Sequence, residues 1–480
     1  RNMVFPVIGG DGKPTGYEVS NSLRFNDGDN PLLTRTHSDT NHRTFTFSCW
    51  VKRSALGTGN QRLFNTDDEA SEDHRIRFTS ADILHISDNQ AGGATYELDT
   101  NRVFRDVSAW YNIVVAWDTT QGTAANRIKL YVNGVQETSF STATYPPQNH
   151  DTLVNQNTSH EVGGSLYDAN GGGPRQPFDG YMSEVYFIDG TAYAASDFGE
   201  TDDNGVWIPK DAKGDLTFGT NGFYMEFQQT GTSANSSGMG ADTSGNDNHF
   251  AATNLAATDV TTDTPTNNFA TLNPLDRHAN VVLSEGNLQT VNTSTGGHYP
   301  IFTNMAFKNG KWYAEFKRAD GNNWKAAIMS IEHDGGSLSV DSTVGNNTSS
   351  VNKVGYGINV SDGNKTHNTT NSSYGSEIGS ILMWAFDADN GKIWWGEDGT
   401  WFASGDPAAG SNEAFSSIDT DTLWTLGFHT YNGHNLIANF GNPPFAISSG
   451  NSDADGHGNF EFAVPSGFFA LCTKNLAEYG

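Results

Sequence analysis

Two stretches of the sequence share an order of strand, turn and strand that constrains the fold more than any other feature. In the first, residues 113–117 form an apolar run that leads into Asp118, and residues 127–132 alternate apolar and polar side chains before Asn133-Gly134. A period of two is typical of a β-strand with one buried face. Asn-Gly between hydrophobic runs favours a hairpin turn, because both residues tolerate positive φ angles. We therefore predict two strands and a tight turn here.

The same order returns near the C-terminus. Residues 381–386 are predicted to form a strand that leads into Asp387, residues 387–391 a turn, and residues 392–395 a Lys-bearing strand that precedes the turn at Asp398-Gly399. Asp, Asn and Gly favour turns through local hydrogen bonds and tolerance of positive φ angles. The repetition predicts two β-sandwich domains of related design in one chain.

The composition agrees with a chain of many short strands. Only 35% of the 480 residues are hydrophobic and 17% are charged, below the averages of roughly 45–50% and 25% in globular domains. Gly, Ser, Thr, Asn and Asp make up the difference, and these residues favour turns. Aromatic residues amount to 12%, which excludes a disordered chain, because disorder goes with few aromatics. The length suits two or three domains.

The net charge of −28 excludes two classes of partner. A chain this acidic lacks the basic surface that attracts nucleic acid or an anionic membrane, and no apolar run is long enough to cross a bilayer. We therefore expect no nucleic-acid partner and no membrane insertion. Cys49 and Cys472 fall in different predicted domains, so we expect two buried thiols and no disulfide between them.

The predicted strands and turn-rich stretches divide the chain into four segments. Residues 1–20 are Gly-rich and are predicted to be an N-terminal leader or linker. Residues 21–210 are predicted to form the first sandwich, residues 211–280 a linker with short strands, and residues 281–480 the second sandwich. The predicted fold class is thus all-β, with two sandwiches joined by an extended linker.

Motifs in both predicted sandwiches point to known families. The first sandwich contains, in order, WYNIVVAWD, RIKLYVNGVQ and FDGYMSEVYFIDG. This set resembles the concanavalin A-like, laminin-G-like lectin domain, which implies a two-sheet jelly roll. The second contains GKWYAEF, FDADNGKIWWGEDG, ANFGNPPF and VPSGFFAL. These motifs resemble a SPRY domain, which is itself a concanavalin A-like sandwich.

The motifs also form one ordered set over nearly the whole chain, from SLRFNDGDNPLLTRT through TPTNNFATLNPL to VPSGFFALCTKNL. This set resembles marine bacteriophage structural proteins that join a laminin-G-like lectin domain to a SPRY-like domain. The resemblance implies a non-catalytic virion protein, assembled in the cytoplasm of the bacterial host. Its partners would be other virion proteins, host-surface carbohydrate or protein, and further copies of the chain in a homo-oligomer.

Three functions follow from this resemblance, in order of preference. The first is a tail-fibre or appendage adhesin that binds host-surface glycans. The second is a capsid-decorating or cementing protein whose sandwiches contact neighbouring subunits. The third is a polysaccharide hydrolase, since related folds include glucan hydrolases.

The hydrolase alternative requires two carboxylates on one face of a strand. Their usual pattern is Glu-x-Asp-x-x-Glu or a close variant, and the two groups lie about 5–5.5 Å apart in a retaining enzyme. In the last strand predicted for the first sandwich, Glu184 and Asp189 are separated by an odd number of positions and would point to opposite faces. Asp387 and Asp389 bound a turn. We therefore expect structural roles for all four and no catalytic residue.

Several side chains could in principle bind a metal ion. No group of Cys and His has the spacing of zinc ligands. Asp27, Asp29 and Asn30, or Asp242 and Asp247, offer the oxygen atoms that Ca²⁺ prefers. Because Asx-rich turns occur throughout this chain, we expect these residues to stabilise turns, with Ca²⁺ as the alternative and no other cofactor.

Aromatic side chains supply the candidate ligand-binding residues. Trp394 and Trp395 are consecutive on a predicted strand, so we expect one in the core and the other exposed or at an interface. An exposed Trp beside polar groups suits a sugar ring, and it equally suits a subunit interface. The candidates for glycan contact are Trp324, Trp395, Trp401 and Tyr431.

Overall fold

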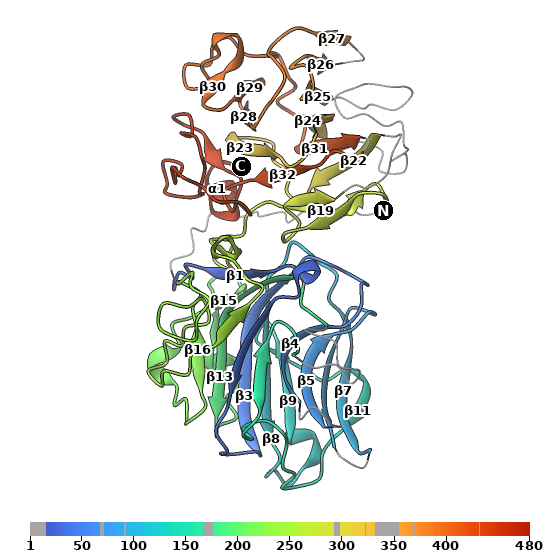
Figure 1. Cartoon of the computed structure of the whole chain (residues 1–480), viewed down its shortest axis with the longest axis vertical. Helices are drawn as coiled ribbons and strands as arrows, with labels where there is room; N and C mark the ends of the chain where they lie inside the picture. The colour runs from blue at the N-terminus through green and yellow to red at the C-terminus, as the bar shows by residue number, and fades with distance from the viewer. Residues whose placement is uncertain are drawn as a thin grey trace. The chain divides into compact units, whose positions relative to one another are not determined.

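The chain folds into two units, each built mainly from two antiparallel β-sheets (Figure 1). The computed structural model describes residues 16–67, 72–90, 93–166, 176–291, 298–321, 323–331, 355–367, 370–431 and 433–480. Within these residues the first unit comprises Gly16–Thr266 and the second comprises Asn267–Gly480. The all-β class predicted from the sequence is confirmed.

The first unit contains two eight-stranded sheets. One sheet consists of β10 (Val135–Glu137), β9 (Ile128–Val132), β8 (Tyr111–Asp118), β3 (Thr44–Arg53), β13 (Gly180–Asp189), β1 (Ser22–Phe25) and β18 (Val260–Thr261), with β16 (Phe223–Met225) paired to β13. The other consists of β11 (Phe140–Thr144), β7 (Thr95–Val103), β6 (Ile83–Asn89), β5 (Asp73–Phe78), β4 (Gln61–Asp67), β12 (Ser159–Val162), β2 (Leu32–Thr36) and β17 (Ala251–Thr253). A short pair, β14 (Gly199–Thr201) and β15 (Trp207–Pro209), lies outside both sheets.

Apolar side chains from the two sheets form one core in this unit. The predicted alternation of β3 is confirmed, because Phe45, Phe47, Cys49 and Val51 all enter this core. The predicted hairpin strands β8 and β9 pair in register from Ile113 opposite Val132 to Trp117 opposite Ile128. The sequence pattern therefore located the central strands of the first sheet correctly.

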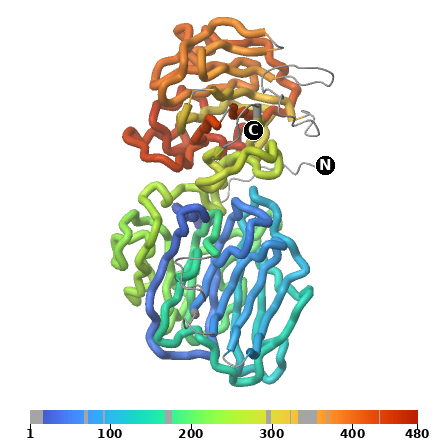
Figure 2. The backbone as a smooth tube through the Cα atoms, turned by 45° about the vertical axis from the view of Figure 1, so that its right-hand side comes forward, coloured from blue at the N-terminus to red at the C-terminus, as the bar shows by residue number. Residues whose placement is uncertain are grey.

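The segment predicted as a linker is instead part of the first sandwich (Figure 2). Its strands β16, β17 and β18 pair with β13, β2 and β1, so the segment adds to both sheets. Phe223, Met225 and Phe250 enter the core, and their burial explains why residues 211–266 pack onto this unit. The division between the units falls after Thr266, not at residue 210 or 280. Residues 1–15 of the predicted leader lie outside the described residues.

A β-bulge interrupts β13 at Glu184. The register with β3 shifts between Ser183 and Tyr186, and Glu184 has a φ angle of +51°. Residues before the bulge pair with β1, and residues after it pair with β16. An extra residue in one strand re-aims the side chains around it. As a result Glu184 lies beside Tyr186, on the face of the sheet opposite to the core residues Val185 and Phe187.

The second unit contains one seven-stranded and one eight-stranded sheet. The first consists of β19 (Leu272–Arg277), β22 (His298–Thr303), β31 (Trp424–Tyr431), β24 (Trp324–Ser330), β25 (Gly355–Asn359), β26 (Lys365–His367) and β27 (Thr370–Ser372). The second consists of β20 (Val282–Ser284), β21 (Gln289–Val291), β32 (Leu436–Asn439), β23 (Lys311–Arg318), β28 (Ile381–Asp387), β29 (Lys392–Glu397) and β30 (Thr400–Trp401), with β33 (Phe469–Ala470) parallel to β23.

The remaining regular elements are short. They are α1 (Thr473–Tyr479) and the 3₁₀ turns η1 (Asp27–Asp29), η2 (Ala124–Asn126), η3 (Ala195–Asp197), η4 (Lys213–Asp215), η5 (Ala257–Asp259) and η6 (Phe402–Ser404). Among the described helices, none has the length and apolar character needed to span a membrane. Cys49 and Cys472 are both buried free thiols, as predicted.

Candidate functional site

A shallow polar pocket of about 370 Å³ lies at one end of the first sandwich, lined by Thr40, Asn41, His42, Arg43, Thr44, Thr120 and Asp151. Three loops build it: the β2–β3 loop, the loop that follows β8, and the loop between β11 and β12. Thr44, the first residue of β3, pairs with Asp118, the last residue of β8. This register places the first two loops next to each other, at the same end of the neighbouring strands β3 and β8.

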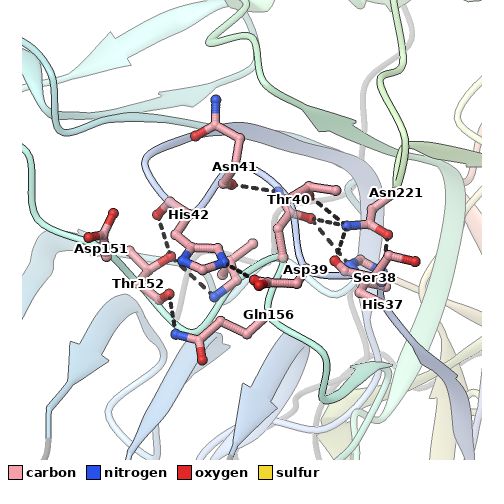
Figure 3. Close-up of polar contacts among 12 residues, drawn as sticks. His37, Ser38, Asp39, Thr40, Asn41, His42, Asp151, Thr152, Gln156 and Asn221 are labelled. Carbon is pink, nitrogen blue, oxygen red and sulfur yellow. Dashed lines mark hydrogen bonds and ion pairs between the residues drawn. The ribbon is translucent and has the colours of Figure 1, made fainter.

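Backbone and side-chain hydrogen bonds hold the β2–β3 loop in place (Figure 3). Asn41 Oδ1 accepts from the backbone N–H groups of Arg43 and Thr44 at 2.9 and 3.0 Å. The carbonyl of His42 accepts from both the backbone N–H and the hydroxyl of Thr152, at 3.1 and 2.9 Å. Hydrogen bonds within the protein therefore hold this wall of the pocket.

A buried polar network lies next to this loop. Asp189 accepts from the Thr40 hydroxyl at 3.0 Å, from Asn155 Nδ2 at 2.9 Å and from the Asn221 backbone N–H at 3.1 Å. Asn221 Nδ2 in turn donates to the Ser38 carbonyl at 2.8 Å (Figure 3). Buried polar groups stabilise one conformation only when their hydrogen bonds are satisfied, as they are here. Asp189 therefore has a structural role, as predicted: it joins the β2–β3 loop to Asn155 and Asn221.

The charged groups of the pocket are open to solvent. Arg43 donates from Nε and Nη2 to the two carboxylate oxygens of Asp151, at 2.6 and 3.1 Å. The two side chains are 43% and 52% exposed. The hydrogen bond from Arg43 holds the pKa of Asp151 below its usual value. His42 Nε2 lies 2.6 Å from Oδ1 of Asp39, whose side chain is 72% exposed.

These groups can recognise a polar ligand but do not form a known catalytic arrangement. The lining combines a guanidinium, an imidazole, a carboxylate, an amide and hydroxyls, and it contains no Phe, Tyr or Trp. Such groups donate to and accept from hydroxyl groups. In the described part of the chain, no hydrogen bond joins the His42 ring to a Ser, Thr or Cys side chain, as nucleophilic catalysis would require.

The residues predicted from the sequence to contact a ligand are not brought together. Trp324 lies in β24 with 1% of its surface exposed, and Trp395 lies in β29 with none exposed. Both belong to the core between the two sheets of the second unit, so the prediction that they contact a glycan is wrong. Trp401 and Tyr431 are half-buried, in β30 and at the end of β31.

The expectation that one of Trp394 and Trp395 would be exposed is also wrong. Trp395 faces the core, and Trp394 faces the other side of the sheet, where it packs with Phe468 and donates from its indole nitrogen to the Ser411 carbonyl at 2.9 Å. The C-terminal segment covers that side. Alternation along a strand therefore placed the two rings on opposite faces correctly, but both faces are covered.

The carboxylates considered for hydrolysis or Ca²⁺ are engaged in the structure. Glu184 accepts from Tyr186 and Tyr224, so it shares no network with Asp189. Asp242 accepts from the backbone N–H groups of Tyr224, Ser244 and Asn248 and from the Ser244 hydroxyl. Asp387 accepts from Asn390 and pairs with Lys311, and Asp389 accepts from the Gly310 N–H. Asp247 and Asp29 are exposed.

The sequence analysis missed Arg43 and Asp151, the charged centre of the pocket. They are far apart in the chain, and no local motif connects them. The one available signal was the polar run HSDTNHR at residues 37–43, directly before a strongly alternating strand. Such a run at the end of a sandwich marks a loop in which binding residues are common.

The likenesses of this chain to solved structures are distant. Solved structures similar to this chain include the PSpry domain of TRIM65 (13% identity, TM-score 0.28, 35% of this chain and 88% of that chain). They also include the SPRY domain of human HERC1 (15%, 0.26, 35% and 96%) and a native heptameric SAP-like pentraxin from Limulus polyphemus (15%, 0.27, 37% and 80%). At these values the likenesses carry no argument about fold or function.

A sequence-family match is more specific. No curated protein matches the chain, but residues 26–196 match the family described as the Concanavalin A-like lectin/glucanases superfamily. The matched range covers less than half of the chain and contains every residue that lines the pocket. Residues 26–196 are thus a concanavalin A-like, laminin-G-like domain, as the sequence motifs predicted.

Proposed function

We propose that this chain is a non-catalytic virion protein of a bacteriophage that binds host-surface glycans through the pocket of its first sandwich. The observation that carries the binding site is the open Arg43–Asp151 pair, set in a loop whose backbone is fixed by hydrogen bonds. All of this lies within the range matched to the lectin superfamily. The virion assignment rests on the resemblance of the ordered motifs to phage structural proteins.

The charges of the pocket favour a neutral glycan. Asp151 already balances the guanidinium of Arg43, and the exposed carboxylate of Asp39 adds negative charge beside His42. An acidic sugar would therefore meet repulsion without an unpaired cation to offset it. Neutral sugar hydroxyls can instead donate to the free lone pairs of Asp151 and accept from the unshared Nη1 of Arg43.

The affinity of a single pocket should be low. The lining has no Phe, Tyr or Trp ring to stack on a sugar face, so polar contacts with well-solvated groups supply most of the binding energy. We expect a dissociation constant near 1 mM, which corresponds to about −4 kcal/mol. Many copies on one particle would convert this weak contact into stable attachment, because each further contact becomes intramolecular. A multivalent virion appendage is therefore a setting in which such a pocket is useful.

A bead-binding assay tests the pocket directly. The full chain is coupled to beads at high density and tested on an array of neutral and acidic bacterial glycans. We expect retention on a neutral glycan, lost in Arg43→Ala and Asp151→Asn. Arg102→Ala is the matched control, because Arg102 forms a partly exposed ion pair with Glu137 and does not line the pocket. Equal retention of Arg43→Ala and the unmodified chain would disprove the pocket as the site.

Immunogold electron microscopy of the intact particle tests the virion assignment. Label on the tail or its fibres is the expected result for an adhesin. Label over the head would favour the capsid-decorating role, in which the sandwiches contact neighbouring subunits. Particles without label, in a preparation where the antibody recognises the purified chain, would contradict a virion protein of either kind.

A further inference from the structure

A second polar cluster lies on the other sheet of the first sandwich and shares no residue with the pocket. It consists of His85 on β6 and of Glu97 and Asp99 on β7. His85 lies directly opposite Asp99 in the strand register. Their neighbours Leu84, Ile86 and Leu98 enter the core. Because side chains alternate along a strand, the three cluster residues occupy the face turned away from that core.

The ligand atoms of the cluster converge on one point. One nitrogen or oxygen atom from each of the three side chains lies within 4.8 Å of the other two. His85 Nδ1 and Asp99 Oδ1 are 2.6 Å apart, and these side chains are 10% and 20% exposed. The cluster is thus held by neighbouring strands, which position side chains more rigidly than loops do.

The chemistry of the three groups suits a divalent transition-metal ion. Imidazole favours zinc and its neighbours among the first-row metals, and carboxylates balance the charge of the ion. One imidazole and two carboxylates thus offer a mixed set of nitrogen and oxygen ligands.

The alternative interpretation is that the carboxylates only balance nearby arginines. Arg77 lies opposite His85 on β5. However, its Nη1 donates to Gln176 at 3.1 Å, and within the described residues Arg77 makes no ion pair with Glu97 or Asp99. Arg77 attracts Glu97 and Asp99 electrostatically, but among the described residues it donates no hydrogen bond to either carboxylate. The arginine therefore leaves the ligand atoms of the cluster open to an ion.

We propose that His85, Glu97 and Asp99 bind one divalent transition-metal ion of the zinc class. Zinc sites are mostly tetrahedral, so three protein ligands leave one position for an outside oxygen or nitrogen ligand. The sequence contains a partial signal for this site, Glu97-Leu98-Asp99, which matches the first part of the hydrolase pattern. The pattern stops there, because Arg102 stands where the second Glu would be and pairs with Glu137.

Metal titration of the full chain tests this site. After dialysis against EDTA, Zn²⁺ binding is followed by calorimetry, and Co²⁺ is used as a probe because bound Co²⁺ absorbs visible light with an intensity that reports its coordination. We expect one equivalent of Zn²⁺ to bind and to displace Co²⁺. Glu97→Gln should weaken Zn²⁺ binding at least tenfold, and His85→Ala should weaken it further.

The variants separate this site from adventitious binding. Glu97→Gln is expected to fold normally, because Glu97 is half-buried and its carboxylate loses only an electrostatic attraction to Arg77, not a hydrogen bond, among the described residues. His42→Ala is the matched control, since His42 also lies beside a single aspartate but without a third ligand. Failure of the unmodified chain to bind Zn²⁺ or Co²⁺ at one equivalent would overturn the proposal. The same holds if Glu97→Gln binds like the unmodified chain, or if His42→Ala abolishes binding.

Discussion

In each sandwich a buried glutamate lies on the face of a sheet turned away from the core, Glu184 in the first and Glu315 in the second, and the two are held by different groups. In the first sandwich, Glu184 accepts from the hydroxyls of Tyr224, at 2.7 and 2.8 Å, and of Tyr186, at 3.1 Å. In the second, Glu315 accepts from the Tyr313 hydroxyl at 2.9 Å. Both carboxylates thus have a tyrosine two positions away on the same strand.

The remaining partners differ. Glu315 also accepts from the backbone N–H groups of Glu461 and Phe462, at 2.9 and 2.8 Å, and from Asn439 Nδ2 at 3.2 Å. Side-chain hydroxyls therefore hold Glu184, whereas backbone groups of a covering segment hold much of Glu315. Backbone donors cannot turn to another acceptor, but a tyrosine hydroxyl can rotate.

The comparison shows that the two carboxylates attach different kinds of neighbour. Glu184 binds Tyr224 on β16, the adjacent strand of its own sheet, whereas Glu315 binds residues 461–462 of a segment that covers its sheet. Neither is open to a substrate, since they are 4% and 0% exposed. The groups proposed for binding in the described chain are instead those of exposed loops and of the face of β6 and β7 that is turned away from the core.

The largest effect that tests this comparison is expected for Glu315→Ala. The substitution leaves the N–H groups of Glu461 and Phe462 without an acceptor, and each unsatisfied buried group costs about 1–3 kcal/mol. We expect a loss of about 3–4 kcal/mol in the free energy of unfolding, measured by urea denaturation. Glu184→Ala should cost less, because its tyrosine donors can rotate. A larger loss for Glu184→Ala would break the distinction.

The pH dependence of the free energy of unfolding is a second way to distinguish Glu184 from Glu315. Burial raises the pKa of Glu184 from 4.5 to about 7, so the folded chain binds this proton more tightly than the unfolded chain. The resulting stabilisation is complete below pH 4.5 and is lost as the pH rises through about 7, with 1.36 kcal/mol for each pKa unit. Glu184→Gln does not titrate. The unfolding free energy of the unmodified chain should therefore fall by about 2–3 kcal/mol relative to Glu184→Gln between pH 4.5 and 8.

Urea denaturation of both proteins at several pH values measures this difference. Glu315→Gln is the control. Burial also raises the pKa of Glu315, but hydrogen bonds from the Glu461 and Phe462 backbone oppose the rise, so its pH-dependent difference should be smaller. A constant difference between the unmodified chain and Glu184→Gln would show that Glu184 is ionised in the folded protein at all these pH values.

A smaller effect is expected for Trp401→Ala. Trp401 is half-buried against Tyr313 on the covered face of the second sandwich. Replacing a fully buried Trp by Ala costs about 3–5 kcal/mol, so a half-buried ring should cost about 1–2 kcal/mol. Glycan retention on beads should not change. If Trp401→Ala lost glycan retention although its stability was normal, the binding site would have to be in the second sandwich.

The smallest effect on stability is expected for Arg43→Ala. The pair that Arg43 forms with Asp151 is about half exposed on both sides, and such pairs contribute about 0–1 kcal/mol. Thermal unfolding should therefore hardly distinguish Arg43→Ala from Arg102→Ala, although only the first should lose glycan retention. A large loss of stability in Arg43→Ala would mean that the pair supports the fold and not a ligand.

The sequence predicted where strands form, but it did not predict which segments cover their outer faces. Period-two patterns predicted β3, β9 and the hairpin of β28 and β29, because alternation is a local property. The same pattern could not reveal that the C-terminal segment covers Trp394. Covering depends on residues distant in the chain, and no local pattern records it.

The candidate site was hidden for a related reason. Its charged centre joins Arg43 to Asp151 across two loops, and only the folded sheet brings these loops together. Similarly, residues 211–266 are rich in turns and short of alternation, which predicted a linker. In the structure their few apolar residues, among them Phe223 and Phe250, complete the core.

The pairing of β17 with β2 and of β18 with β1 affects folding during synthesis and the choice of fragment boundaries. During synthesis, β1 and β2 lack these partners until residue 261 has been made. A fragment that ends at residue 196, where the family match ends, would keep the pocket but leave β1 and β2 with unpaired edges and a core without Phe223 and Phe250. Unpaired edges invite aggregation, so the first sandwich should be cut after Thr266 to yield a soluble fragment.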